Sequence, residues 1–597
     1  MKRLTIGQLA TFSFVFLSAP ALPQPKPPTT PFVDVTDGSN IYYKVGYTTP
    51  SLQGLYAYSL KKATIGGVAA GDCDKDGDID LFITYGNTGG PDGGGGPNRL
   101  YLNQLAEQGN GLLFEDIAAE AHVANTRSDG RGNDRHSGPT FADMDGDGDL
   151  DLFVGGIFED SNKIYENQGN CHFIDVTSNS PEIENMRASH TISAAFGDYD
   201  LDGDLDMYLT HWGTLDELYG YPRIVETDHL WRNDSDESGI RFVNVSDETG
   251  ISDMTYLTRP YPFCGEETCP NGGDVQIADF SFSPTFARIN DDPWPDIAIA
   301  GDFGTTQLAI NFGGKKFGAL NNPILRDAQW GMGSALGDFD NDGDLDWFIS
   351  SILGPSDGRI HPKGNRFFTN VGGSSLLIDD TARLGVADGS FGWGACFLDI
   401  DNDSDLDIYH TNGYPGPFLT RNDPYDIDAS RAFVMNESGT YTDEAKTLGL
   451  DTRTSGRGIV CADFDNDGDI DILELTDASP NSGRLWENRT AAADRNFLRV
   501  KLEGLPPNTE AAGARIYVQT GEKTQMREIM IGSNFTSQNP TVQIFGLDSA
   551  ESVDQIIVEW PAIDSGEGPK QLGTLLQGPI PASRPGRIIV IRHPELP

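Results

Sequence analysis

The sequence is poor in positive charge. It has 42 Lys and Arg residues against 90 Asp and Glu residues in a chain of 597, which gives a formal net charge of -48. Such an acidic protein repels the phosphates of nucleic acids and the headgroups of anionic membranes. We therefore expect neither nucleic acid nor an anionic membrane surface as a partner.

Long apolar runs are missing beyond the first twenty residues. The mostly apolar stretch Leu4 to Leu17 follows the basic pair Lys2-Arg3 and precedes Ala19-Pro20-Ala21, a small-x-small cleavage pattern. These features predict a secretory signal over residues 1–21, and a Pro-rich linker follows over 22–30. A membrane anchor is the alternative, but the run is short and no later stretch reaches spanning length. We expect a secreted or extracellular protein, in the periplasm or on the cell surface if the host is bacterial.

Cysteine is scarce, with six residues in the whole chain. No second Cys or His pair stands at zinc-ligand spacing, which argues against a zinc site. Cys264 and Cys269 share one loop, and in an exported protein we expect a local disulfide between them. We expect the other four cysteines to be buried thiols near strands.

Catalytic signatures are almost absent. Gly354-Pro-Ser356-Asp-Gly358 matches a G-x-S-x-G motif, but that chemistry needs its Ser on a strand-to-helix turn, and no helical pattern follows. We interpret it as an ordinary turn. We expect no enzymatic activity and assign no catalytic and no cofactor-binding residue.

Acidic residues, in contrast, are concentrated in a nine-residue pattern with Asp at every second position, which occurs in six copies. Five copies carry Gly at position 6, and the copy at residue 399 does not. The aspartates of the six copies are Asp72, Asp74, Asp76, Asp78 and Asp80; Asp143, Asp145, Asp147, Asp149 and Asp151; Asp198, Asp200, Asp202, Asp204 and Asp206; Asp338, Asp340, Asp342, Asp344 and Asp346; Asp399, Asp401, Asp403, Asp405 and Asp407; Asp463, Asp465, Asp467, Asp469 and Asp471.

This spacing predicts calcium loops. Calcium takes six to eight oxygen ligands, which positions 1, 3 and 5 supply as side chains and position 7 as a backbone carbonyl, while Gly at position 6 permits the turn. An EF-hand would end with Glu at position 12 between helices, whereas here Asp closes the loop at position 9 between strand-like flanks. A solvated acidic turn would explain one copy but not six in one register. We predict about six Ca²⁺ sites.

A seventh, degenerate copy reads Arg288-Ile-Asn290-Asp-Asp292-Pro-Trp294-Pro-Asp296. We expect it to be free of metal. Our hypothesis is that the Arg288 guanidinium replaces the ion and pairs with Asp292 or Asp296.

Each Asp loop belongs to a longer repeat of four short strands. A small-residue strand precedes the loop, as in Gly138-Pro-Thr-Phe-Ala, and a second follows it, as in Asp151-Leu-Phe-Val. A third strand ends in Asn, and a fourth follows a turn, as in Phe173-Ile-Asp-Val-Thr. The third-strand residues are Asn103, Asn167, Asn233, Asn311, Asn370, Asn436 and Asn488. Seven such units predict an all-β, seven-bladed β-propeller over residues 31–492.

The seventh unit lacks a fourth strand after Asn488. A matching strand stands at the other end of the propeller sequence, as Phe32-Val-Asp-Val-Thr36. We predict that this N-terminal strand completes the last blade and so protects an exposed sheet edge. An open array of seven units is the alternative, and it leaves the match unexplained.

The Asp loops end before residue 496. From there to residue 593, segments such as Phe497-Leu-Arg-Val-Lys-Leu and Ile556-Ile-Val-Glu-Trp alternate or run apolar, with turn residues between them. This pattern predicts a second, small all-β domain of the sandwich type.

Several segments resemble known families. The repeats look like FG-GAP/VCBS blades of the kind found in integrin α-subunit propellers, and Phe391-Gly-Trp-Gly-Ala-Cys-Phe-Leu-Asp399 resembles the cartilage acidic protein family in particular. The tail is similar to the ASPIC/UnbV domain through Gly513-Ala-Arg, Gly532-Ser-Asn-Phe-Thr-Ser-Gln538 and Val558-Glu-Trp-Pro561. The resemblance implies secreted calcium binding and adhesion or matrix association, and no established catalytic activity.

We therefore expect a secreted, monomeric calcium-binding propeller that acts in adhesion or binds an extracellular protein or polysaccharide. Its binding surface should lie on the longer connections, since propellers usually bind through loops on a rigid scaffold. Those connections are 86–97, 212–227, 353–363 and 414–428, together with the insertion that carries Cys264 and Cys269. The alternative is an exported enzyme or enzyme accessory with a site on the upper loops or in the central channel, where His211 and His410 would be candidates.

Overall fold

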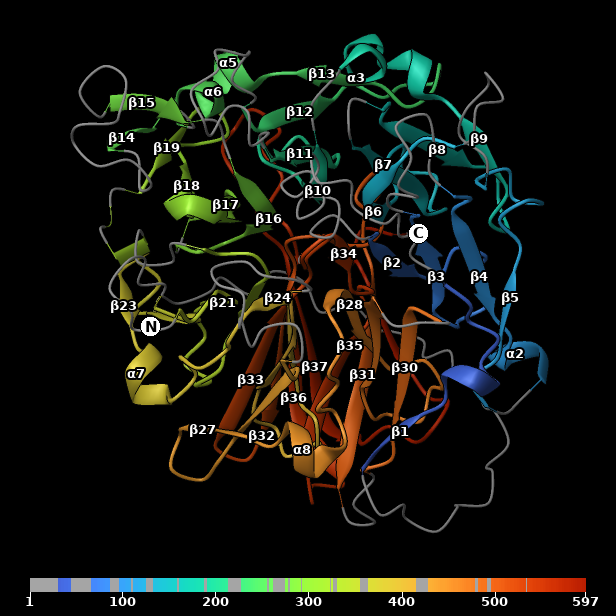
Figure 1. Ribbon diagram of the computed structural model, residues 1–597, viewed down its shortest axis with the longest axis vertical. Coiled ribbons are helices and arrows are strands. Elements are labelled where there is room, and N and C mark those ends of the chain that lie inside the picture. The colour runs from blue at the N-terminus through green and yellow to red at the C-terminus, as the bar shows by residue number, and fades with distance from the viewer. Residues whose placement is uncertain are drawn as a thin grey trace, which may run out of the picture.

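The computed structural model consists of seven small antiparallel sheets arranged in a ring and a two-sheet domain that follows them in the chain (Figure 1). The all-β propeller predicted from the repeats and the small β-domain predicted from the alternating segments after residue 496 are confirmed. The structure describes residues 31–43, 66–85, 96–108, 111–124, 133–157, 160–186, 190–212, 227–254, 257–260, 274–277, 280–290, 292–320, 322, 324–325, 330–354, 363–414, 428–477, 481–490, 495–532 and 534–596.

Each propeller sheet is called a blade here and is numbered in chain order. Blade 1 contains β2 (Val68–Gly71), β3 (Asp80–Ile83), β4 (Arg99–Asn103) and β5 (Phe114–Asp116); blade 2 contains β6 (His136–Ala142), β7 (Asp151–Gly156), β8 (Lys163–Asn167) and β9 (Phe173–Asp175). Blade 3 contains β10 (Thr191–Gly197), β11 (Asp206–His211), β12 (His229–Asn233) and β13 (Phe242–Asn244); blade 4 contains β16 (Ser281–Ala287), β17 (Asp296–Gly301), β18 (Gln307–Asn311) and β19 (Phe317–Ala319). Blade 5 contains β20 (Ser334–Gly337), β21 (Asp346–Ile349), β22 (Arg366–Asn370) and β23 (Leu377–Asp379); blade 6 contains β24 (Gly392–Leu398), β25 (Asp407–Asn412), β26 (Arg431–Met435) and β27 (Tyr441–Asp443). Blade 7 contains β28 (Gly456–Ala462), β29 (Asp471–Thr476), β30 (Gly483–Asn488) and, from the N-terminus, β1 (Phe32–Asp34).

The remaining elements are short. They are η1 (Thr36–Gly38), α2 (Leu105–Gln108), η2 (Thr177–Asn179), α3 (Pro181–Asn185), α5 (Ser246–Thr249), α6 (Ile251–Met254), the hairpin of β14 (Leu257–Pro260) and β15 (Asp274–Ile277), η4 (Asp302–Gly304), α7 (Thr381–Leu384) and α8 (Ala445–Leu448). Among the described residues, no helix is long and apolar enough to cross a membrane.

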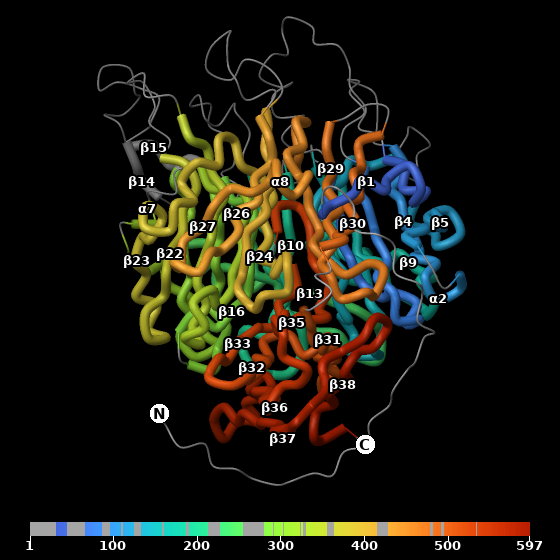
Figure 2. Tube along the Cα trace, turned by 90° about the horizontal axis from the view of Figure 1, so that it is seen from below, coloured from blue at the N-terminus to red at the C-terminus, as the bar shows by residue number. Residues whose placement is uncertain are grey.

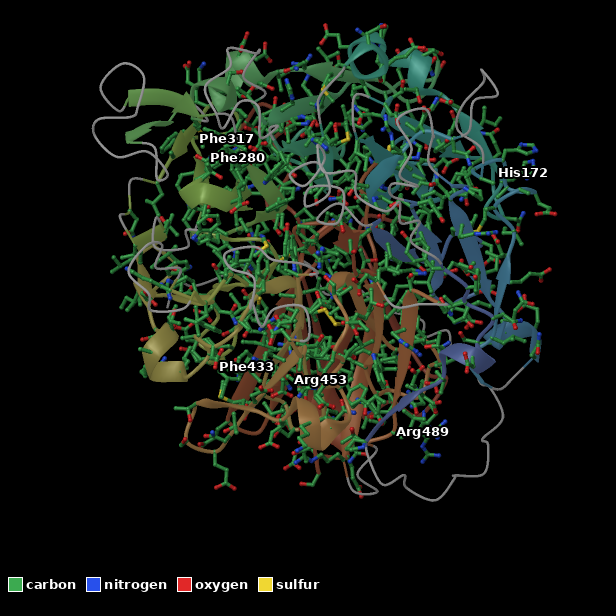
Figure 3. All side chains as sticks on the ribbon, viewed as in Figure 1. His172, Phe280, Phe317, Phe433, Arg453 and Arg489 are labelled. Atoms are coloured by element: carbon green, nitrogen blue, oxygen red, sulfur yellow. A yellow bond between two sulfur atoms is a disulfide. The ribbon has the colours of Figure 1, made fainter. Side chains whose placement is uncertain are left out.

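The ring is held together by apolar clusters between neighbouring blades. The first strand of each blade contacts that of the next, and β28 of blade 7 contacts β2 of blade 1. One cluster fills each of the seven blade contacts. Figure 3 shows side chains filling this space, among them Phe317 at the contact of blades 3 and 4 and Phe433 at that of blades 5 and 6. Because sheets pack on both faces, the central strands read as continuous buried runs.

The last blade is closed by the N-terminal strand. β1 pairs antiparallel with β30, placing Phe32 opposite Asn488 and Asp34 opposite Trp486. Arg484 Nη1 also contacts Asp34 Oδ2 at 3.1 Å across this pair. The strand missing from the end of the seventh unit is thus supplied by the start of the first.

Four cysteines form disulfides, so the prediction that they are buried thiols was wrong. Cys73 pairs with Cys171, and Cys396 pairs with Cys461. Each bond joins neighbouring blades, the first blades 1 and 2, the second the strands β24 and β28 of blades 6 and 7. The predicted Cys264–Cys269 bond lies outside the described residues, as do the predicted signal and linker.

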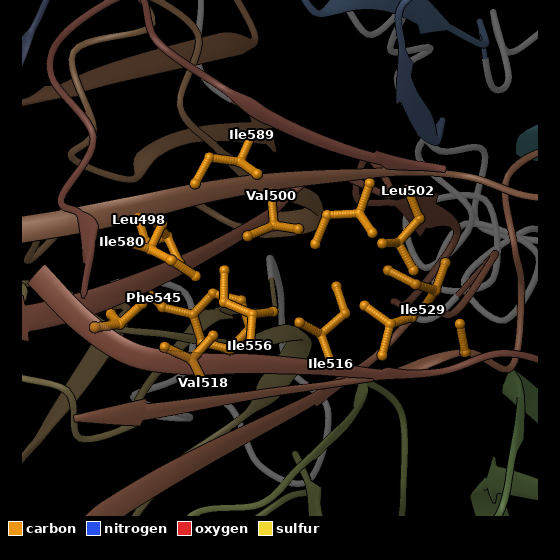
Figure 4. Packing of buried hydrophobic residues seen from close by; sticks show 14 of the residues in the cluster. Leu498, Val500, Leu502, Ile516, Val518, Ile529, Phe545, Ile556, Ile580 and Ile589 are labelled. Carbon is orange, nitrogen blue, oxygen red and sulfur yellow. The ribbon is translucent and has the colours of Figure 1, made fainter. Parts of the chain in front are cut away.

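The C-terminal domain is a sandwich of two sheets. One sheet has the order β35 (Gln543–Asp548), β31 (Asn496–Glu503), β38 (Ile589–Arg592), and the other the order β33 (Lys523–Glu528), β32 (Arg515–Thr520), β36 (Ser552–Glu559), β37 (Gly573–Pro581). Leu498, Val500, Ile516, Val518 and Ile556 are among the side chains packed between them (Figure 4). The domain lies against one end of the ring, drawn in red below the propeller in Figure 2.

One segment of this domain enters the centre of the ring. It spans residues 531–540, and within it β34 (Ser537–Gln538) pairs parallel with β2 of blade 1. The Gln538 side-chain amide bonds the N–H and the carbonyl of Phe141 in blade 2, each at 2.7 Å. Asn539 Oδ1 accepts the Cys461 N–H of blade 7 at 3.0 Å. The segment, called the plug here, therefore uses the inner edges of several blades.

Candidate metal centres

The six Asp loops share one backbone conformation. In blade 2 the Gly148 N–H donates to Asp143 Oδ2 at 2.8 Å, and the Asp149 N–H donates to Asp147 Oδ1 at 2.8 Å. The first of these bonds, from position 6 to position 1, recurs in the other five complete loops. Gly148 has φ +89°, a left-handed conformation that suits Gly. Ser404 takes this place in blade 6 with φ +72°.

Carboxylates at positions 1, 3 and 9 converge. One oxygen from each lies within 4.8 Å of the others in three sets, and each set contains residues of one loop. The sets are Asp72, Asp74 and Asp80; Asp143, Asp145 and Asp151; Asp198, Asp200 and Asp206. The chain thus folds into oxygen clusters of the kind that a divalent cation needs.

Side chains at position 7 are used elsewhere. Asp149 forms an ion pair with Lys75, with Oδ1 2.6 Å from Nζ. Asp78 accepts bonds from Asn466 Nδ2 at 2.9 Å and from the Ala106 N–H. The predicted contribution of this position, a backbone carbonyl, does not involve these side chains. Asp76, Asp78 and Glu107 form a further acidic group in blade 1, and Glu107 was not predicted from the sequence.

The Asp at position 9 also organises its blade. Asp151 is buried, and its two oxygens accept the N–H groups of Met144 in the loop and of Asn167 at the end of β8, both at 2.8 Å. The same pair of bonds recurs in the other five complete loops. This carboxylate therefore joins the loop to the third strand as well as facing the candidate metal position.

The Asn that ends the third strand links neighbouring blades. The Asn167 Nδ2 of blade 2 donates to the Cys73 carbonyl of blade 1 at 3.0 Å. Equivalent bonds join Asn103 to Phe464, Asn233 to Met144, Asn311 to Tyr199, Asn370 to Ile289 and Asn488 to Ile400. Blade 6 is the exception, since β26 ends in Met435, whose N–H meets Asp407. Asn436 lies one residue later, so our alignment of that copy was wrong.

The clusters are electrostatically strained without a cation. Burial raises the pKa of Asp143 to about 6, that of Asp338 to about 7 and that of Asp399 to about 7. The loop of blade 3 also contains carboxylate oxygens that lack a hydrogen-bond partner among the described residues. Buried Oδ1 atoms of Asp198, Asp200 and Asp204 have no hydrogen-bond partner within the described part of the chain. Oxygen-only donors that are crowded, buried and partly unsatisfied fit a hard divalent cation.

Blade 4 differs, but our hypothesis for Arg288 was wrong. Its guanidinium pairs with the C-terminal domain, with Nη2 3.4 Å from Glu559 Oε2 and Nε 3.9 Å from Glu528 Oε2. Among the described residues, no ion pair joins it to Asp292 or Asp296. Arg288 points out of the loop because two buried or half-buried glutamates of another domain offer it a better partner than its own loop.

The histidines that would serve an enzymatic site, His211 and His410, do not line an open site. His211 and His410 are fully buried, and burial lowers the pKa of His410 to about 3. The plug occupies the channel, and a cavity of about 140 Å³ beside it is lined by Asp399, Asp463 and Arg499 among others. Ser356 and most of the long connections lie outside the described residues, which end at 85, 212, 354 and 414 before those segments.

Comparisons with known proteins agree with the two-part organisation. The FG-GAP-like repeat model matches residues 143–209 and 288–349, and the ASPIC and UnbV model matches residues 504–572. Cartilage acidic protein 1 of Mus musculus is 24% identical over 521 residues, which cover 83% of this chain and 70% of that protein. The Homo sapiens protein is also 24% identical over 521 residues, 83% of this chain and 68% of its own.

Solved structures resemble the chain only loosely. An Agrocybe aegerita lectin that recognises non-reducing terminal N-acetylglucosamine has a TM-score of 0.35 at 15% identity, covering 64% of this chain and 79% of its own. A rhamnogalacturonan lyase of Bacillus licheniformis has a TM-score of 0.36 at 13% identity, covering 72% of each chain. Likenesses at this level carry no argument about binding or catalysis.

Proposed function

We propose that this chain, which joins FG-GAP-like repeats to an ASPIC and UnbV domain, is an exported calcium-stabilised propeller that acts by binding and has no catalytic activity. The observation that carries the proposal is the convergence of buried and half-buried carboxylates at positions 1, 3 and 9 in the loops of blades 1, 2 and 3. Each loop joins the first and second strands of its blade, so the proposed ion holds those strands together.

The chain's own groups prepare each site. Backbone N–H groups fix the orientation of the carboxylates at positions 1, 5 and 9, so little side-chain entropy remains to be lost on binding. Calcium supplies positive charge that offsets the mutual repulsion of four or five crowded carboxylates. Affinities of about 10⁻⁴ to 10⁻³ M, typical of extracellular modules, would suffice outside the cell.

The partner we propose is an extracellular protein or a polysaccharide, bound in adhesion or in a related extracellular interaction. The relationship to cartilage acidic protein 1 and the leader-like residues 1–21 support an extracellular setting. Saturable binding without turnover is the behaviour expected of such a module.

Thermal unfolding of the mature chain tests the metal. After chelation, added calcium should raise the melting temperature, with about six ions bound per chain by metal analysis. Each site contributes about 1.4 kcal/mol when free calcium is ten times its Kd. The variant Asp145→Asn should bind one ion fewer, whereas Asp175→Asn, on an outer strand of the same blade, should keep the full count. An unchanged melting temperature and no bound calcium would overturn the proposal.

A further inference from the structure

The first strand of the C-terminal domain crosses three Asp loops in succession. Arg495, just before β31, lies against blade 6, with Nη1 2.5 Å from Asp401 Oδ1. The Nε atom of Arg499 is 3.2 Å from Asp463 Oδ2 in blade 7. The Nζ atom of Lys501 is 3.3 Å from Asp72 Oδ2 in blade 1. Residues 495–501 are called the strap here.

The strap spans the place where the ring closes. Blades 6, 7 and 1 are consecutive in the ring, and blade 7 is the one completed by β1. The pair of Arg499 and Asp463 is buried, with side chains 4% and 2% exposed, so solvent screens it little. The pairs of Arg495 and Lys501 are more exposed. All three cations face carboxylates at positions 1 or 3, which are predicted calcium ligands.

Blades 2 and 3 meet the same domain without cations. Thr509 donates its hydroxyl to Asp143 in blade 2, and the Asp564 N–H donates to the Leu201 carbonyl of blade 3 at 2.8 Å. Among the described residues, no Lys or Arg lies within ion-pair distance of a carboxylate at position 1, 3, 5 or 9 of these two loops. Blade 3 is also the loop with several buried, unpartnered carboxylate oxygens.

The domain presents carboxylates to the degenerate loop of blade 4. At blade 4, where Arg288 stands in place of an Asp, the domain pairs Glu528 and Glu559 with that guanidinium, and its Arg515 donates to the Arg288 carbonyl. A cation beside a ligand carboxylate both neutralises it and repels an incoming dication. Where the C-terminal domain supplies such a cation, the loop should therefore bind calcium more weakly.

We propose that the strap is an electrostatic substitute for calcium at the ring-closing seam, and that it divides the metal sites of blades 1, 2, 3, 6 and 7 into two classes. This inference rests on the proposed calcium binding. Blades 2 and 3 are the tight sites, which fill first. Blades 6, 7 and 1 are the weak sites, where the strap holds the loops until calcium is abundant. By reciprocity, calcium in those three loops loosens the hold of the strap.

Calorimetric titration of the chelated, full mature chain with calcium tests the inference. The native chain should show a tight and a weak class of sites. The triple variant Arg495→Gln, Arg499→Gln, Lys501→Gln should bind calcium roughly tenfold more tightly in the weak class, with the tight class unchanged. Arg592→Gln is the matched control, because Arg592 belongs to the same domain and pairs with Glu503 at 2.7 Å, away from the loops.

Further variants assign individual loops to the tight or the weak class of sites. Asp145→Asn in blade 2 should remove a tight site, whereas Asp74→Asn in blade 1 should remove a weak one. If the triple variant does not fold, Lys501→Gln alone should tighten one weak site, and Lys501→Arg should leave it as in the native chain. One uniform class of sites, or unchanged affinity in a folded variant, overturns this inference and leaves the proposed function standing. Absence of any calcium binding overturns the proposed function itself.

Discussion

Buried acids occur in this protein outside the metal loops as well. Glu474 lies in β29 of blade 7, is fully buried, and accepts the Ser430 hydroxyl of blade 6 at 3.0 Å. Burial raises the pKa of Glu474 from its ordinary 4.5 to about 7. A folded-state pKa above the unfolded value means that the folded protein holds this proton more tightly. The stability from Glu474 is therefore complete below about pH 4 and is lost as the pH rises through 7.

The substitution Glu474→Gln should remove this pH dependence. In saturating calcium, the variant should be close to the native protein in stability at pH 5 and more stable at pH 8, by an amount on the order of 3 kcal/mol at most. Denaturant unfolding at the two pH values measures the difference. Glu115→Gln, on an exposed outer strand, is the control and should change neither value. Greater stabilisation at pH 5 than at pH 8 would contradict the assignment.

Strands are joined across blades by side-chain amides as well as by apolar packing. In blade 4, Asn311 Nδ2 donates to the Tyr199 carbonyl of blade 3 at 2.8 Å and to the Pro295 carbonyl at 3.1 Å. Its Oδ1 accepts the Gly314 N–H at 2.9 Å. The Asn311 donor lies in the blade that we expect to lack metal, whereas the Tyr199 acceptor lies within the Asp loop of blade 3.

The substitution Asn311→Ala should destabilise the protein by about 1 to 3 kcal/mol, because it leaves buried carbonyls without their donor. Chemical denaturation in saturating calcium measures this loss. Asn436→Ala is the matched control, since Asn436 bonds to Thr440 within its own hairpin in blade 6. An Asn311→Ala protein as stable as the native one would show that the amide link carries no net stability.

Local repetition explains what the sequence could predict. Six copies of one loop, with strand signals at fixed offsets, predicted the blades, the carboxylates that converge and the closing strand. Contacts between residues of different repeats leave no such pattern in the sequence. Cys73 pairs with Cys171 only because blade packing brings one loop beside the next hairpin, 98 residues away. Arg288 pairs with glutamates of the other domain, and the nine residues of its own loop carry no signal for that contact.

The interface between the two domains could not be predicted from the sequence either. Arg499 and Lys501 read as ordinary alternation within a strand, and their positions over two loops depend on how the sandwich docks. The segment Gly532 to Gln538 resembles part of the ASPIC/UnbV domain, but its residues carry no signal that it enters the ring. A weak signal existed at Gly67 and Gly458, where any side chain would collide with Thr536 or Ser537. Such glycines permit close approach of another chain segment.

At the scale of the whole molecule, the plug links the two domains through buried contacts. Phe535 is fully buried, with its ring 5.1 Å from that of Phe282 in blade 4 and 5.2 Å from that of Trp393 in blade 6. The neighbouring Thr536 N–H donates to Ser193 Oγ in blade 3 at 3.1 Å. The centre of the propeller is thus completed by side chains from the other domain.

We expect the native protein to unfold in a single calorimetric transition. The substitution Phe535→Ala should cost about 3 to 5 kcal/mol, and that loss should lower the unfolding temperature of the propeller although the residue belongs to the other domain. Leu575→Ala, at a half-exposed site on β37, is the control and should have little effect. Two separate transitions in the native protein, with the propeller unaffected by Phe535→Ala, would show that the domains are independent.

The closing strand also bears on how the chain reaches its native state. Leu485 donates its N–H to Thr36 Oγ1, a bond between residues 449 positions apart. In synthesis from the N-terminus, β1 is the first propeller strand to emerge and its partner β30 is the last, so the earlier blades form an open arc until β30 is made. Such an arc has an unpaired strand at each end, the feature through which incomplete β-proteins join one another. A chain truncated before residue 483 should therefore aggregate. It should not close into a smaller ring of fewer blades.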